Sequence, residues 1–157
     1  MAGPLTIAAP TAGAMQALGE RLGRLLAAGD VLALLGPLGA GKTTFVQGVA
    51  RGTGVPPGRH VASPTFALVN EHPGRVPLVH ADLYRIADPR ELEELGLRDA
   101  FDRAAVAIEW LDRFPDAAPP ERLEIEIAIA PDGGRHLVLR PIGARATALC
   151  AVFEKGP

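Results

Sequence analysis

The segment from Gly36 to Thr43, with the sequence GPLGAGKT, has the residue types and spacing in this chain that most directly suggest chemistry. It matches the pattern G-x-x-x-x-G-K-[ST], in which glycines let consecutive backbone N–H groups point inward at phosphate oxygens. The lysine of this pattern, Lys42, reaches the β- and γ-phosphates, and the hydroxyl of Thr43 is a natural Mg²⁺ ligand. The segment therefore predicts a phosphate-binding loop, or P-loop, that holds a nucleoside triphosphate.

A P-loop also needs a carboxylate that helps to hold Mg²⁺, usually at the end of a strand beside the loop. Two acids fit this description, because Asp82 and Glu109 each follow a short apolar run. Ligands of open α/β sheets bind at the carboxyl ends of parallel strands, where both acids are expected. The residue pattern alone does not decide which of the two is the metal ligand.

Four further residues near these positions have both a functional and a structural interpretation. Thr65, in the segment Ser-Pro-Thr, fits a switch that senses the γ-phosphate or an ordinary turn. Trp110, the only tryptophan, can stack on a base or fill the core. His80 is more typical of a packed histidine than of a base. Arg135 follows a turn that can approach the nucleotide.

The elements that must position these residues alternate between helix and strand. Helical spacing of apolar residues and cap signals predict helices over 15–28, 43–52 and 88–97, and a short helix over 142–153. Short apolar runs predict strands over 31–35, 66–71, 77–83 and 104–108. Alternation over 122–129, a turn at 131–134 and a return over 136–140 predict a C-terminal β-hairpin. This order indicates an α/β fold with a mostly parallel central sheet.

Composition limits the possible classes of protein. A length of 157 residues fits one domain. The net charge is −2 and the arginines are not clustered, which argues against tight autonomous binding of nucleic acid. A shared contact with nucleic acid within a complex stays open. The one cysteine, Cys150, cannot form an internal disulfide and is expected to be buried. No signal peptide and no apolar run of about 20 residues are present, so no membrane association is expected and the cytoplasm is the expected location.

Several segments together resemble the TsaE family, also called YjeE, the small ATPases of bacterial tRNA threonylcarbamoyladenosine synthesis. The P-loop alone is generic, whereas the DLYR and IEW segments together are specific to this family. The resemblance covers roughly residues 15–140. The matching segments, in the family's order and spacing, are GPLGAGKTT (36–44), SPTFALV (63–69), HADLYR (80–85), ADPREL (87–92), ELGLRD (94–99) and IEW (108–110).

The resemblance implies roles for the matching residues. Lys42, Asp82 and Thr65 are implied as catalytic residues, with Asp82 positioning metal-bound or attacking water and Thr65 in a switch-like loop. Thr43 and Glu109 are implied as the Mg²⁺ ligands. The residues implied to contact the nucleotide are Gly39, Ala40, Gly41, Lys42, Thr43, Thr44 and Trp110.

One residue of the loop departs from the family pattern. Pro37 stands where the family commonly has an acidic residue, and proline has no N–H to donate. The amides from Gly39 to Thr44 are therefore expected to bind the phosphates.

The family's fold is a P-loop NTPase-like three-layer α/β sandwich, which implies one P-loop ATPase domain over residues 1–157. The resemblance implies ATP and Mg²⁺ as cofactors, and the TsaB and TsaD proteins as partners. Its implied function is ATP hydrolysis in support of threonylcarbamoylation of adenosine 37 in tRNAs that read codons starting with A. Hydrolysis is expected to be weak alone and stimulated by partners. The transfer itself occurs on TsaD, and tRNA is reached through the complex.

Three other classes of P-loop protein are alternatives. A small-molecule kinase needs an acceptor pocket and an arginine-rich lid, and no lid insertion is evident. A GTPase-like switch needs an Asn-Lys-x-Asp segment, and the second lysine of the chain, Lys155, is not in one. A non-catalytic nucleotide-binding module would not need the two acids Asp82 and Glu109.

Overall fold

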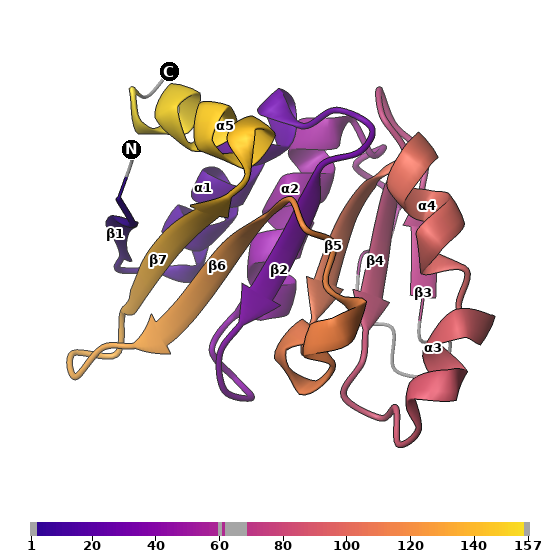
Figure 1. The fold of residues 1–157 in the computed structure, drawn as a ribbon. Helices are drawn as coiled ribbons and strands as arrows, with labels where there is room; N and C mark the ends of the chain where they lie inside the picture. Colours follow the sequence, from indigo (N-terminus) through magenta and orange to yellow (C-terminus); the bar gives the residue numbers. More distant parts are fainter. Residues whose placement is uncertain (1–2, 60, 62–68, 156–157) are drawn as a thin grey trace.

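The computed structural model describes residues 3–59, 61 and 69–155, which form a seven-stranded sheet with helices on both faces (Figure 1). The order of strands across the sheet is β1-β7-β6-β2-β5-β4-β3. The strands are β1 (Leu5–Ala9), β2 (Val31–Leu35), β3 (Val69–His72), β4 (Leu78–Asp82), β5 (Ala105–Glu109), β6 (Arg122–Ile129) and β7 (Arg135–Ile142).

The four central strands β6, β2, β5 and β4 are mutually parallel. β7 pairs antiparallel with β6, β1 pairs antiparallel with β7, and β3 pairs antiparallel with β4. β1 therefore runs in the direction of the central strands, so that five of the seven described strands share one direction. The expected α/β fold, with a mostly parallel sheet and a C-terminal β-hairpin, is confirmed.

Two hydrophobic clusters cover the two faces of the sheet and make the molecule three layers thick. The side chains of β2 alternate between them, because Leu32 and Leu34 enter one cluster and Val31 and Ala33 enter the other. The first cluster contains residues of α1 (Ala12–Leu25), α2 (Lys42–Thr53) and α5 (Ala144–Glu154). The second contains residues near α3 (Pro89–Glu94) and α4 (Leu97–Arg103).

Glycines bring α1 and α2 into backbone contact. A Cβ atom on Gly48 would lie 2.1 Å from the carbonyl oxygen of Gln16, and one on Gly23 would lie 2.3 Å from that of Val49. Gly19 and Gly52 are equally close to the opposite helix. The N-terminal part of α1 contacts the N-terminal part of α2, so the two helices are parallel. Their N-termini therefore lie at the same edge of the sheet.

Several element boundaries differ from the sequence-based expectations. α1 begins at Ala12, because the Thr11 side chain caps it by accepting a hydrogen bond from Ala14 N at 3.0 Å. The helix expected over 88–97 is two helices, because Gly96 adopts the left-handed conformation with φ of 72° and separates α3 from α4. The first strand, β1, was not predicted from the sequence. Residues 66–68 of the strand expected over 66–71 lie outside the described residues.

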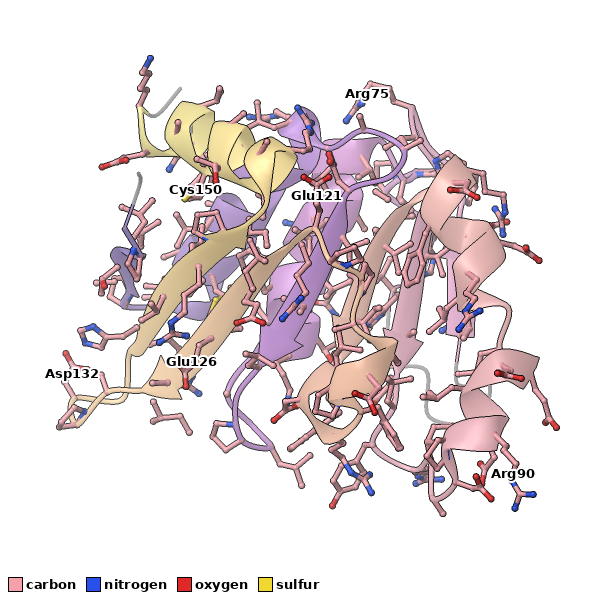
Figure 2. All side chains as sticks on the ribbon, viewed as in Figure 1. Arg75, Arg90, Glu121, Glu126, Asp132 and Cys150 are labelled. Atoms are coloured by element: carbon pink, nitrogen blue, oxygen red, sulfur yellow. The ribbon has the colours of Figure 1, made fainter. Side chains whose placement is uncertain are left out.

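The C-terminal part of the chain follows the expected pattern more closely. β6 spans the expected residues 122–129, and β7 extends the expected return strand by one residue at its start and two at its end. The tail is helical from Ala144 to Glu154. Cys150 lies on α5 and is buried, as expected (Figure 2).

Candidate functional site

The P-loop joins the carboxyl end of β2, the central strand of the sheet, to the N-terminus of α2 (Figure 1). Gly41 is the N-cap of α2 with φ of 106°, a conformation that a residue with a Cβ rarely adopts. The first N–H groups of a helix have no acceptor within it, so those of Lys42, Thr43 and Thr44 face the loop. The N–H of Ala40 differs, because it donates to the carbonyl of Pro37 at 3.1 Å. The loop thus has the amide-rich geometry that anions bind at helix N-termini.

The side chain of Lys42 is buried and folded back onto its own loop. Its Nζ donates to the carbonyl oxygen of Gly36 at 2.5 Å and lies 3.7 Å from the centroid of the Trp110 ring. Burial lowers the pKa of Lys42 below its ordinary value, and the nearby carboxylates of Glu109, Asp82 and Asp112 offset only part of this shift. The ammonium therefore sits between the P-loop and the acids that follow the neighbouring strands. Asp112, which sequence reasoning did not single out, belongs to this group of charges.

Trp110 follows β5 in an uncommon backbone conformation. Its φ of 66° is the only positive φ among the described residues other than glycine. Its ring covers Lys42 on one side and lies 5.0 Å, centroid to centroid, from the ring of Tyr84. Trp110 thus contacts the P-loop lysine, and its implied contact with a nucleotide stays a prediction.

Asp82 and Glu109 lie next to each other at the carboxyl ends of two paired strands. In the parallel register of β4 and β5, Asp82 is opposite Glu109. Glu109 is buried, with 3% of its surface exposed, whereas Asp82 is partly exposed and its Oδ1 accepts a hydrogen bond from Tyr84 N at 2.9 Å. The structure therefore brings both predicted acids to the same edge of the sheet as Lys42.

His80 is buried, as expected of a packed histidine, but it also contacts a predicted site residue. Its Nε2 lies 2.6 Å from Oε2 of Glu109. Two residues before Asp82 on one strand, His80 shares a face of the sheet with it. That spacing in the sequence was the available signal for this contact.

Arg135, at the start of β7, contacts the P-loop from the C-terminal hairpin. Its Nε donates to the carbonyl of Ala40 at 2.8 Å and its Nη2 to that of Gly39 at 3.2 Å. Arg135 therefore lies beside the P-loop, and its expected approach to a nucleotide stays a prediction. A hollow of about 180 Å³ lies beside this contact. Its lining includes Thr11, Met15, Gly41, Thr44, Gly134 and Arg135.

The N-terminal lining of that hollow was missed from the sequence. Ala9, Pro10 and Thr11 reach the P-loop because β1 pairs with β7, which is distant in the chain. The cap signal at Thr11 was present in the sequence, but nothing local indicates that this helix start faces the P-loop.

Two other predicted site residues can be placed only in part. Thr65 lies outside the described residues. Thr43 is in the first turn of α2, two residues after the Gly41 cap. In the described part of the chain, no three His, Cys, Asp or Glu side chains form a group that could hold a metal by themselves. A metal bound through Thr43 and one carboxylate would need further ligands, such as phosphate oxygens and water.

Comparisons with known proteins identify the family to which this chain is similar. Residues 9–137 match the family model described as threonylcarbamoyl adenosine biosynthesis protein TsaE. A tRNA threonylcarbamoyladenosine biosynthesis protein TsaE from Bacillus subtilis is 43% identical over 129 residues, which cover 81% of this chain and 79% of that protein. The protein of the same name from Streptomyces coelicolor is 38% identical over 148 residues, or 88% and 99% of the two chains.

A solved structure extends the similarity to the fold. The crystal structure of Bacillus subtilis YdiB superposes with a TM-score of 0.85 at 32% identity, covering 99% of this chain and 97% of that one. The P-loop NTPase fold is therefore shared. Because the family model matches well over half of the residues and several relatives exceed 30% identity, this chain belongs to the TsaE family.

Proposed function

We propose that this chain binds ATP with Mg²⁺ and hydrolyses it as one P-loop domain, in support of tRNA threonylcarbamoyladenosine biosynthesis. The observation that carries the proposal is the position of the Lys42 ammonium. It lies in a P-loop that follows the central strand, where burial lowers its pKa and the charges of Glu109 and Asp82 partly offset that shift. A cation that faces several acids across an amide-lined loop suits a site in which phosphate and a divalent cation bind together.

The proposed phosphate ligands are the Lys42 ammonium and the loop amides, from Gly39 to Thr44. For Lys42 to reach a phosphate, its ammonium must leave the Gly36 carbonyl, and the ring of Trp110 must follow or give way. The Ala40 N–H must likewise leave the Pro37 carbonyl before it can donate to a phosphate. Trp110 therefore lies where nucleotide binding should change its surroundings.

The chemistry of the donor atoms fits Mg²⁺, which prefers oxygen ligands and usually takes few from the protein. The Thr43 hydroxyl and the buried Glu109 carboxylate are the proposed ligands. Held by these two residues, Mg²⁺ would supply positive charge against the negative charge that develops on the phosphates during hydrolysis. Asp82, which is partly exposed, is proposed to orient the attacking water, and Thr65 is proposed to respond to the γ-phosphate.

The proposed role places the chain in an assembly. Relatives are named as tRNA threonylcarbamoyladenosine biosynthesis proteins. We infer that this chain acts with TsaB and TsaD in the cytoplasm. The substrates of this assembly are tRNAs that read codons starting with A, and the modified nucleoside is adenosine 37. This chain hydrolyses ATP, while TsaD transfers the threonylcarbamoyl group. The described residues include no helix that is both long and apolar enough to cross a membrane.

The test is ATP binding and hydrolysis by the purified chain, alone and with TsaB, TsaD and tRNA. Lys42→Ala removes the charge at the P-loop, and Lys155→Ala, at the end of α5, is the matched control. Loss of charged hydrogen bonds to phosphate should weaken ATP binding by roughly 10- to 100-fold in Lys42→Ala and leave Lys155→Ala unchanged.

Hydrolysis by the wild-type chain should be slow and should rise when the partners are added. Equal ATP binding by Lys42→Ala and wild type would refute the P-loop assignment. Hydrolysis that ignores the partners would refute the role in the assembly and would direct attention to a phosphoryl acceptor instead.

A further inference from the structure

His80 and Glu109 form a buried polar contact at the site. The proposed function gives a role to Glu109 but none to its contact with His80. Nε2 of His80 lies 2.6 Å from Oε2 of Glu109, and the two side chains are 0% and 4% exposed. The strands that carry them are neighbours, with His80 opposite Ala107 and Asp82 opposite Glu109. His80 therefore approaches the Glu109 carboxylate diagonally, from one step deeper in the sheet.

The direction of this hydrogen bond follows from the chemistry of the two groups. An ionised carboxylate only accepts hydrogen bonds, so the hydrogen lies on Nε2 of His80 and is donated to Glu109. The other ring nitrogen, Nδ1, is buried and has no hydrogen-bond partner among the described residues.

We propose that His80 is a positioning residue that fixes the orientation of the Glu109 carboxylate for a divalent cation. Its hydrogen bond engages Oε2 and leaves Oε1 as the oxygen not contacted by the imidazole. Carboxylates that bind metals are commonly held by such a neighbouring donor, and loss of the donor typically weakens metal binding by about 10- to 100-fold. This inference rests on the proposed function, since it takes Glu109 to be a Mg²⁺ ligand.

Three substitutions of His80 separate donation from packing. His80→Phe retains a ring of similar shape and removes the donor. His80→Gln keeps an amide nitrogen near the position of Nε2, whereas His80→Asn is one methylene shorter and does not reach Glu109. His72 is the matched control, because it is also buried, lies on the adjacent strand β3 and is hydrogen-bonded to Arg59 rather than to Glu109.

The measurement is the affinity of the protein–ADP complex for Mn²⁺, followed by the electron paramagnetic resonance signal of free Mn²⁺. The affinity for ADP in EDTA is measured in parallel and reports on the site without metal. His80→Phe and His80→Asn should bind Mn²⁺ about 10- to 100-fold more weakly, with ADP affinity in EDTA nearly unchanged. His80→Gln should regain much of the loss, and His72→Phe should match the wild type.

Wild-type Mn²⁺ affinity in His80→Phe would overturn the proposal, as would an equal loss of ADP binding with and without metal. If His80→Phe does not fold, the Gln and Asn variants decide, because equal Mn²⁺ affinities in these two would also overturn it. A wild-type chain that binds no ADP, or whose ADP complex binds no Mn²⁺, would overturn both this inference and the proposed function. If the wild type binds ADP and Mn²⁺ and the His80→Phe variant binds Mn²⁺ equally well, only the role of His80 is refuted and the proposed function stands.

Discussion

The two helical layers hold the two halves of the site in different ways. On one face, α1 and α2 are 14 and 12 residues long, meet backbone to backbone at four glycines, and position the P-loop. On the other face, α3 and α4 have six and seven residues, and between them only Ala100 is buried. The P-loop thus starts a tightly packed helix, whereas the chain that follows Asp82 leads into lightly packed helices.

This difference has consequences for local stability. Segments with few buried apolar contacts open at lower free energy than the core of the same protein. We therefore expect α3 and α4 to open more readily than α1 and α2. The phosphate-binding half would remain in place while the chain after Asp82 rearranges.

The turn between β3 and β4 contacts the C-terminal ends of α1 and α2. The backbone N–H of Arg75 donates to the carbonyl of Thr53 at 2.7 Å, at the end of α2. Its guanidinium donates to the carbonyls of Leu26 and Gly23 at 2.9 Å, at the end of α1. Figure 2 shows Arg75 at the edge of the molecule where these helices end. Arg75, in the turn that precedes β4, thus satisfies carbonyls at the C-termini of both long helices.

The largest expected effect is on the packing of α1 against α2. Gly48→Ala places a Cβ 2.1 Å from the carbonyl of Gln16, and two helix backbones must separate to accept it. Overpacking of this kind costs about 1–3 kcal/mol or more of unfolding free energy. Urea denaturation measures this loss.

The matched control for this change is Gly13→Ala, in the first turn of α1. A Cβ there meets nothing closer than the Thr11 hydroxyl, at 3.8 Å. Since alanine is the better helix former, Gly13→Ala should stabilise the protein by about 0.5–1 kcal/mol. Similar stability changes in the two variants would show that the close helix contact does not limit the fold.

The next effect concerns the two acids at the ends of β4 and β5. Glu109→Ala should weaken Mg²⁺-dependent ATP binding by at least about 10-fold, because it removes a buried carboxylate that is a proposed ligand. Asp82→Ala should weaken this binding less and should lower the rate of hydrolysis more. Magnesium titrations of both variants measure the order, and the reverse order would mean that the metal assignment is wrong.

A smaller effect is expected from the loss of the Arg75 side chain, which binds the C-terminal end of α1. Arg75→Ala leaves the carbonyls of Gly23 and Leu26 without a charged donor, and hydrogen bonds to charged groups are worth about 1.5–3 kcal/mol. Because Arg75 is exposed, its removal lets water reach these carbonyls, and we expect a loss near the lower value. Arg75→Lys retains the charge and should recover part of the loss in the same denaturation measurement.

The sequence predicted those parts of the site that depend on local patterns. Lys42 and Thr43 belong to a contiguous motif, and Asp82 and Glu109 each end a recognisable strand, so their shared edge follows from parallel pairing. The contact of His80 with Glu109 depends on the register between two strands. Local spacing places His80 on the correct face but does not identify its partner.

Other features depend on chain segments that are distant in sequence. The approach of Thr11 to the P-loop requires β1 to pair with β7, more than a hundred residues away. The glycine contact between α1 and α2 depends on how the two helices lie on the sheet. The break at Gly96 was missed because apolar and acidic residues continue a helical pattern across it, although the left-handed conformation there favours glycine.

The smallest effect is expected in α3, where a change should remain local. Asp88 caps this helix by accepting a hydrogen bond from Arg90 N at 2.9 Å, and the Glu91 side chain accepts one from Asp88 N in return. Figure 2 shows Arg90 on the outer side of the helix. Asp88→Ala should speed amide hydrogen exchange in α3 and leave exchange in α1 and α2 unchanged.

Acid should have the same local effect as Asp88→Ala. Hydrogen bonds from the Arg90 side chain, and then from its backbone, lower the pKa of Asp88 below its ordinary value of 3.8. Because the folded-state pKa is the lower one, the cap is at full strength above pH 3.8 and is lost as pH falls through the folded value. Exchange in α3 of the wild type should therefore rise toward that of Asp88→Ala in this acid range. If exchange in α2 rose in parallel, the two layers would open as one unit, and the proposed difference between them would not exist.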